Sequence, residues 1–185
     1  MENLFERVLD EDEKLIKVYK PNKCKFLFSN ILLMSLVLLV FASIGVLAVL
    51  FPEEGVASEP IYVLIPIGIY VFLLGLYIVF LAIYYKNVVY AYTNKRIIIR
   101  SGIFGVDFKS LDMAMIGAVN VYVSLIDKIL KKDTGSLTFG SMASPMGAQA
   151  GSIYKFSNIV MPYETCKEIK SAIDKFKNTQ KQDRK

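Results

Sequence analysis

The chain has 185 residues, a formal net charge of +5 and a hydrophobic content of 54%. This length suits one domain, but the apolar fraction and a mean hydropathy of +0.44 exceed those of an ordinary soluble domain. There is no histidine, and neither of the two cysteines has a CxxC partner. These features disfavour zinc, haem and iron–sulfur sites, so we expect no metal and no cofactor.

The first 25 residues form an N-terminal segment that carries six basic and six acidic residues. We expect a short helix at its start and a short strand in KLIKVYKP, residues 14–21. The apolar side chains of that helix need a surface to rest on, either the membrane or the folded domain. The side chains in question are Leu4, Phe5, Val8 and Leu9.

Two runs without a charged residue follow, at 26–51 and 61–85. As a helix, either run is about 38 Å long, which is enough to cross a hydrocarbon core of about 30 Å. The 25 residues before the first run are too many for the n-region of a cleaved signal peptide, so we expect a retained helix. Residues 26–85 are therefore predicted to be a transmembrane helical hairpin with a short external loop at 52–60.

Charge predicts the orientation of this hairpin. The loop at 52–60 carries three glutamates and no lysine or arginine, whereas basic residues flank the two runs on their other sides. By the positive-inside rule, both termini face the cytoplasm of a multi-pass protein in the plasma membrane. Residues 86–185 carry sixteen basic and eight acidic residues, so the basic excess belongs to the cytoplasmic part.

From residue 86 the pattern changes to short β-rich runs broken by turn residues. Strands are expected at 88–93 and 96–101, followed by a corner, and again at 117–124, 136–141 and 152–161, with a short helix at 124–132. A proline-led helix then starts at Pro162, with an apolar stripe at spacings of three and four residues. The stripe consists of Tyr163, Cys166, Ile169, Ile173 and Phe176.

These elements predict two transmembrane α-helices followed by a small antiparallel β sandwich or barrel, which is capped by a C-terminal amphipathic helix. The cytoplasmic domain is expected to span 86–177. Residues 178–185 have no apolar side chain and are expected to form a disordered basic tail.

The order of the motifs resembles the membrane-anchored bacterial pleckstrin-homology-like (PH-like) family. The matching stretches are YTNKRIIIRSG, IGAVNVYVSLIDKIL and TGSLTF, together with the proline-led final helix. The resemblance covers residues from about 12 to 176 and implies a PH-like sheet preceded by two transmembrane helices. The family has no established catalytic residues, so the resemblance implies a fold more than an activity. The small-residue loop at 140–152 departs from it.

Motifs of catalysis are missing from the sequence. There is no GxSxG elbow, no GxxxxGK[ST] loop and no strand-linked GxGxxG. Neither apolar run contains a charged side chain that could relay a proton or bind an ion. We therefore expect a protein that is not an enzyme.

The first two cytoplasmic strands and the corners at their ends supply the candidate site residues. The strand at 88–93 is expected to lead away from the bilayer for about 20 Å, and the next strand to return. This places Lys86, Arg100 and Phe104 near the lipid headgroups as candidate membrane contacts. Lys95 and Arg96 lie at the remote turn, and they are candidates for binding a partner or are simply solvated.

The loop at 140–152 is read either as a mobile connection or as a lip that binds a partner through Met142 and Met146. Two functions remain open for the domain. It is either a protein-interaction or self-assembly module, or a sensor of anionic lipid headgroups. The expected partner is the lipid bilayer, and anionic lipid, a second copy of the chain and another membrane protein are further candidates; no nucleic acid is expected.

Overall fold

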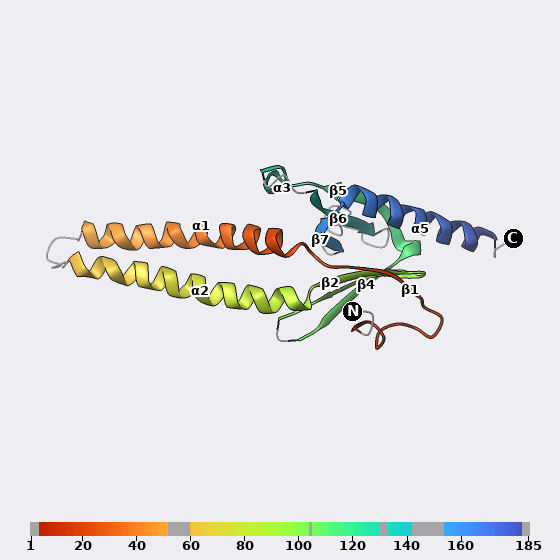
Figure 1. Cartoon of the computed structure of the whole chain (residues 1–185), viewed down its shortest axis with the longest axis horizontal. Helices are drawn as coiled ribbons and strands as arrows, with labels where there is room; N and C mark the ends of the chain where they lie inside the picture. Colours follow the sequence, from red (N-terminus) through yellow and green to blue (C-terminus); the bar gives the residue numbers. More distant parts are fainter. Residues whose placement is uncertain (1–3, 52–59, 104, 130–132, 142–153, 183–185) are drawn as a thin grey trace. The chain divides into compact units, whose positions relative to one another are not determined.

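The structure is a computed structural model, which describes residues 4–51, 60–103, 105–129, 133–141 and 154–182. Figure 1 colours the chain along its sequence and labels its helices and strands. The chain divides into two compact units. Residues Cys24–Lys86 form one unit, which we call the helical hairpin. The other unit, which we call the sheet domain, combines Met1–Lys23 with Asn87–Lys185.

The helical hairpin consists of two long helices that lie side by side (Figure 1). Helix α1 spans Lys23–Leu50, and a short 3-10 turn at Pro60–Val63 leads into helix α2 at Leu64–Asn87. Among the described residues, these are the two helices long and apolar enough to cross a membrane, by length and composition. Their most apolar windows bury none of their residues within the protein. An apolar helix that buries no face needs an apolar surrounding, so the predicted spans are candidates for membrane association.

A close approach of the two helices occurs at a glycine. A Cβ atom added to Gly45 would lie 2.9 Å from the Cβ atom of Pro66, so only glycine fits there without a shift. This agrees with the packing of small residues between the chain's own two helices. Nearer the sheet-domain ends of the helices, the ring of Phe26 packs on Tyr84 and Tyr85, with centroids 5.9 Å and 5.5 Å away.

The sheet domain begins with a four-stranded antiparallel sheet in the order β1-β2-β3-β4. The strands are β1 at Leu15–Tyr19, β2 at Val89–Thr93, β3 at Arg96–Ser101 and β4 at Asp107–Asp112. Strand β1 therefore pairs with β2 across the whole helical hairpin, with Tyr19 opposite Tyr90. The corner between β3 and β4 needs Gly102, because its φ is +141° and an added Cβ would lie 2.0 Å from the carbonyl oxygen of Gly105.

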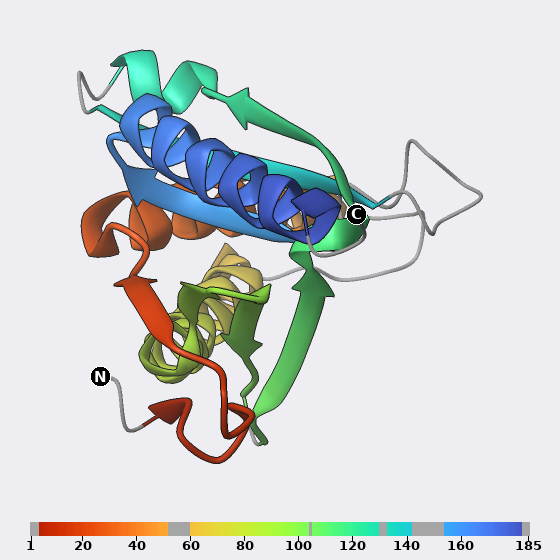
Figure 2. The same cartoon turned by 90° about the vertical axis from the view of Figure 1, so that its right-hand side faces the viewer.

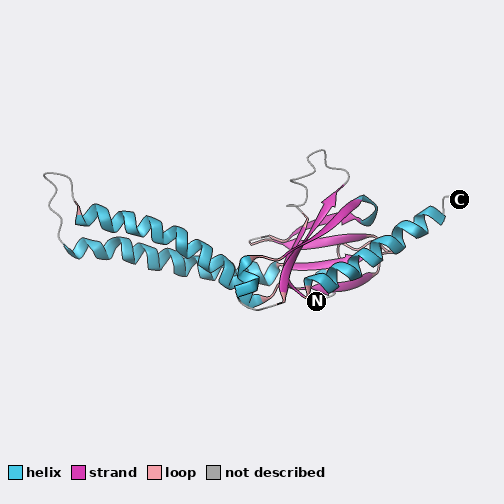
Figure 3. Ribbon diagram, turned by 90° about the horizontal axis from the view of Figure 1, so that it is seen from above, coloured by secondary structure: helices cyan, strands magenta, loops and turns pink. Residues whose placement is uncertain are grey.

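A second antiparallel sheet has the order β5-β6-β7. Its strands are β5 at Ile116–Tyr122, β6 at Thr134–Ser141 and β7 at Lys155–Val160. A 3-10 turn at Met113–Met115 joins the two sheets, and the short helix α3 at Leu125–Ile129 follows β5. Helix α5, at Pro162–Gln182, lies across the second sheet (Figures 2 and 3). The architecture is thus two sheets closed by a C-terminal helix.

Strand β2 is buried along its whole length because both of its faces are covered. On one face, Val89 and Ala91 pack with Phe5 of the N-terminal segment. On the other face, Tyr90 stacks on Phe156 of the second sheet, with centroids 4.8 Å apart. On α5, the residues Cys166, Ile169 and Ile173 of the apolar stripe are buried. The core therefore has an aromatic centre between the sheets and a smaller cluster beneath the N-terminus.

Two predicted boundaries were wrong. The N-terminal segment does not stand apart from a domain that starts at residue 86, because its strand β1 is an edge of the first sheet and Phe5 is fully buried. Of the two surfaces considered for its apolar residues, Phe5 and Leu9 use the domain, whereas Leu4 is exposed. The expected tail at 178–185 also starts too early, since α5 continues to Gln182. Helix propensity of Lys and Gln extends α5 beyond its apolar stripe.

Candidate functional site

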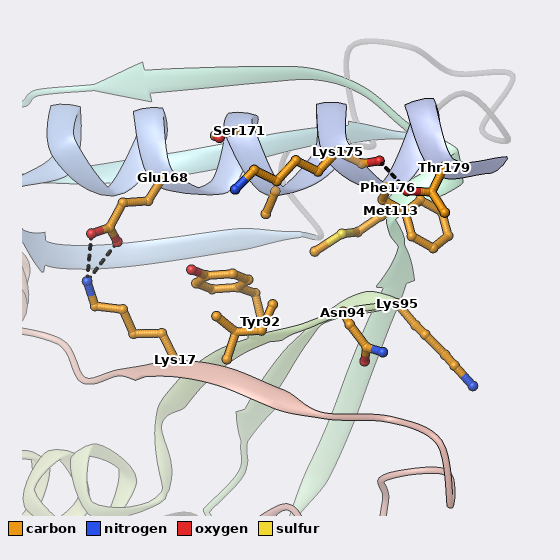
Figure 4. A pocket seen from close by; sticks show the side chains of 12 residues that line it. Lys17, Tyr92, Asn94, Lys95, Met113, Glu168, Ser171, Lys175, Phe176 and Thr179 are labelled. Atoms are coloured by element: carbon orange, nitrogen blue, oxygen red, sulfur yellow. Dashed lines mark hydrogen bonds and ion pairs between the residues drawn. The ribbon is translucent and has the colours of Figure 1, made fainter. Parts of the chain in front are cut away.

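A groove of about 710 Å³ lies between α5 and the edge of the first sheet (Figure 4). We call it the α5–β1 groove. Its sheet side is formed by residues of β1, β2, the turn after β2 and the 3-10 turn, namely Ile16, Lys17, Tyr92, Asn94, Lys95 and Met113. Its helix side is formed by Glu168, Ser171, Ala172, Lys175, Phe176 and Thr179.

Helical spacing explains why α5 can both close the core and line the groove. The six groove residues recur at intervals of three and one, which places them on one face of the helix. The neighbouring face carries Cys166, Ile169 and Ile173 and is buried. In the predicted stripe, Phe176 turns out to lie in the groove and Tyr163 is exposed. The stripe is therefore divided between the core, the groove and the surface.

One end of the groove is closed by an ion pair between its two walls. The Lys17 ammonium donates to both carboxylate oxygens of Glu168, at 2.9 Å and 2.7 Å, and the Tyr19 hydroxyl donates to the second of them at 2.8 Å. The hydrogen bond from Lys17 and then that from Tyr19 lower the pKa of Glu168. Burial and the bond to Glu168 raise the pKa of Tyr19. Glu168 is therefore held as a carboxylate that bridges β1 and α5.

Two further lysines give the groove its charge. Within the described part of the chain, no ion pair is formed by Lys95 or Lys175. Figure 4 shows the Lys175 side chain running back along α5 and the Lys95 side chain pointing away from the helix. With Lys17 neutralised by Glu168, the apolar groove keeps an excess of positive charge. Such a groove favours an apolar ligand that carries carboxylates or another anion.

Arg96, predicted to bind a partner or to be solvated, forms an ion pair within the domain. Its guanidinium donates to Glu13 at 2.7–3.2 Å and to the backbone oxygen of Val8 at 3.0 Å. The Glu13 side chain is fully buried, and Thr93 donates a further hydrogen bond to it at 2.6 Å. Burial works against ionisation of Glu13, but the hydrogen bonds from Arg96 and Thr93 outweigh it and lower its pKa.

This pair gives Arg96 a structural task, because it fastens the N-terminal segment to the turn after β2. Lys95, its neighbour, is left at the rim of the groove. The prediction that the two residues bind a partner stays untested, but the geometry separates them.

The candidate membrane contacts are placed only in part. Arg100 lies opposite Val89, and the Asn87 amide donates to the backbone oxygen of Gly102 at 3.1 Å. The chain thus returns to the start of β2, as the strand-turn-strand pattern predicts. Lys86 is exposed at the end of the helical hairpin. Phe104, Met142 and Met146 lie outside the described residues.

The sequence contains no local signal for the groove. Lys17 and Glu168 are 151 residues apart and meet only because β1 joins the sheet beside α5. Among the described residues there is no group of three or more acidic or cysteine side chains that could hold a metal ion.

Two sheets of four and three antiparallel strands, closed by a C-terminal helix, fit a PH-like domain, and the α5–β1 groove lies beside its edge strand β1. Comparison with known proteins agrees with this class. Residues 31–174 match the family described as the bacterial PH domain, and the chain belongs to that family. No match was found among curated proteins or among solved structures.

Proposed function

We propose that this protein is a non-enzymatic membrane-anchored module that binds an acidic, apolar segment of a partner protein in the α5–β1 groove. The observation that carries the proposal is the groove itself. It offers about 710 Å³ beside the edge strand β1, and its lining includes Lys95 and Lys175, which form no ion pair among the described residues. Peptide segments commonly dock between a sheet edge and a helix, where apolar pockets supply affinity and charges supply specificity.

The membrane anchor in this proposal is the helical hairpin. The apolar lengths of α1 and α2 support two spans, and the glutamate-rich loop at 52–60 supports an external position for it. In this topology both termini and the sheet domain face the cytoplasm, and the groove is offered to cytoplasmic or membrane-bound partners.

Site-specific photocrosslinking in native membranes tests the groove. A crosslinking amino acid at Ala172, inside the groove, is compared with one at Lys167, which is exposed on α5 and lines no described cavity. We expect a product at position 172 that is absent at position 167 and is lost when Lys175→Glu is added. The crosslinked peptide should be acidic and apolar.

Identical products at both positions, or recovery of the bait alone, would contradict the proposal. A product formed with a second copy of the chain would assign the groove to self-assembly.

Sensing of anionic lipid is the second candidate, and the return of Arg100 to the start of β2 favours it. In nanodiscs, hydrogen exchange of residues 96–103 is compared with and without phosphatidylglycerol. Protection that needs the anionic lipid and disappears in Arg100→Gln would support this candidate, and exchange that ignores lipid charge would remove it.

A further inference from the structure

Exposed apolar side chains are unevenly distributed over the sheet domain. Of its ten exposed large apolar or tyrosine side chains within the described residues, five occur at one end of the second sheet. They are Tyr122, Leu125, Val160, Met161 and Tyr163. Three of these are also the most exposed of the ten, at 61% for Tyr122, 76% for Leu125 and 60% for Tyr163. We call this group the apolar tip.

Strand register brings the five residues together. Tyr122 ends β5 opposite Ser136, and Val160 ends β7 opposite Thr134, so both lie where β6 begins. An added Cβ on Gly135 would lie 2.9 Å from Pro162 and 3.1 Å from the carbonyl oxygen of Tyr122. Met161 and Tyr163 flank Pro162 in sequence, and α3 with Leu125 follows β5 after two residues.

The backbone at the tip is firmly held, so the exposure of these side chains is built into the fold. The buried Asp127 carboxylate accepts hydrogen bonds from the backbone and hydroxyl of Ser124, and from the hydroxyl of Thr134. This fixes α3, and with it Leu125, against β6. Met161 has a left-handed φ of 52°, which is uncommon for a residue with a side chain, and its carbonyl accepts from Thr165.

Connectivity shows which end of the domain carries the tip. Tyr19, the last residue of β1, lies opposite Tyr90 near the start of β2, so the chain leaves and re-enters the first sheet at one end. The backbone N–H of Asn22 donates to the carbonyl of Asn158 at 2.7 Å. This bond ties the same end to Asn158 of β7, only three residues before Met161. The tip therefore shares the end of the domain to which both apolar helices are joined.

We propose that the apolar tip inserts into the interfacial layer of the bilayer that holds the helical hairpin. This inference rests on the proposed membrane anchor, and it adds a second lipid contact that the anchor does not require. Tyrosine rings favour the headgroup level of a bilayer, and Leu125 and Met161 supply apolar surface for the layer beneath it.

The side chains near the tip carry both signs of charge. The tip should therefore contact the bilayer by inserting apolar side chains rather than by binding charged headgroups. Among the described residues, the basic side chains nearby are Lys128 and Lys155, and the acidic ones are the exposed Asp133 and Glu164 together with the buried Asp127. In the sequence, Lys131 and Lys132 follow α3 and add two positive charges. Together these charges nearly cancel. Contact at the tip should therefore persist at high salt, which distinguishes it from recognition of anionic headgroups.

Lipid-quenched fluorescence on the full chain tests the inference. An environment-sensitive probe is attached to Leu125→Cys or Tyr163→Cys in a Cys24→Ser background, where the buried Cys166 stays unlabelled. The matched control is Asn178→Cys, exposed on the same helix as Tyr163 and about 22 Å further along it. A second control, Leu36→Cys in the middle of α1, reports on anchoring. All are reconstituted in phosphatidylcholine vesicles that carry a nitroxide at the headgroup or deep in the acyl chains.

We expect probes at 125 and 163 to emit at shorter wavelength and to be quenched by the headgroup nitroxide several-fold more than the probe at 178, at low and high salt alike. The proposed insertion of the tip would be overturned if probes at 125 and 163 were quenched no more than the probe at 178. If position 36 were still quenched by the deep nitroxide in that case, the membrane anchor would stand. If position 36 is not quenched, the proposed membrane anchor is contradicted, and so is the insertion of the tip, which depends on it. A blue shift without lipid quenching, or quenching lost at high salt, would also overturn the inference.

Discussion

The helical hairpin and the strand β2 are both almost wholly apolar, yet they find opposite environments. Every residue of β2 is buried by the domain itself, with Phe5 on one face and Phe156 on the other. The apolar windows of α1 and α2 bury none of their residues in the protein. Apolar area stabilises a structure only where something removes it from water. The sheet domain buries its own apolar strand, whereas the apolar helices of the hairpin are candidates for burial in a membrane.

The largest expected effect tests the part that covers itself. Phe156→Ala removes the ring that packs on Tyr90 and Phe139, and we expect a loss of about 3–5 kcal/mol in the free energy of unfolding of the sheet domain. Hydrogen exchange in β6, measured on the detergent-solubilised full chain, reports it. Leu36→Ala, on an exposed position of α1, is the control and should leave this exchange unchanged. If Leu36→Ala increased hydrogen exchange in β6 as much as Phe156→Ala does, the sheet domain would not be stabilised by its own core independently of the hairpin.

A second prediction concerns the N-terminal segment as part of the sheet domain. Glu13→Gln leaves the Arg96 guanidinium without its buried anion, and we expect destabilisation by about 3 kcal/mol. The double variant Glu13→Gln with Arg96→Met should recover part of the loss in the same hydrogen-exchange measurement. A single variant as stable as the wild-type chain would show that this pair does not fasten the segment.

The same pair predicts a pH dependence. The pKa of Glu13 is lower in the folded chain than its ordinary value of 4.5, so the folded state favours the carboxylate. Its contribution is complete above pH 4.5 and is lost as the pH falls through the lowered pKa. The difference in unfolding free energy between the wild-type chain and Glu13→Gln should therefore narrow below pH 4.5. A difference that stays constant from pH 7 to pH 3 would contradict this.

A smaller effect is expected where the hairpin packs on itself. Gly45→Leu places a side chain against Pro66, and overpacking of this kind costs about 1–3 kcal/mol. Disulfide crosslinking between cysteines introduced on facing positions of α1 and α2 should slow in this variant. Gly75→Leu, where an added side chain meets open space, is the matched control. The sheet domain should keep its unfolding temperature in both variants.

The smallest expected effect is at the end of the groove. The Lys17–Glu168 pair is about half exposed, and pairs of this kind contribute about 0–1 kcal/mol. Lys17→Met should therefore change the stability of the sheet domain little, while it opens one end of the groove. Crosslinking from position 172 should change in this variant more than hydrogen exchange in β6 does. A large loss of stability in Lys17→Met would instead show that the Lys17–Glu168 pair contributes to the stability of the folded domain.

Much of the architecture is determined by local pattern in the sequence. The two uncharged runs are long enough for spans, and the runs around Asn94 and Lys95 form the predicted hairpin of β2 and β3. The proline-led helix carries its apolar stripe at helical spacing. These features depend on residues close together in the chain, where backbone geometry and periodicity decide the outcome.

What tertiary structure alone decided lies between residues far apart. Arg96 appears in the sequence as an exposed turn cation, but it meets the buried Glu13 from 83 positions earlier and becomes a half-buried ion-pair partner. Strand β1 joins the sheet across the helical hairpin, and this creates a groove whose walls no local pattern connects. The apolar tip likewise gathers the ends of β5 and β7 with the start of α5. Periodicity shows which face of an element is apolar, but only the packed fold decides whether that face meets the core, a groove or the surroundings of the protein.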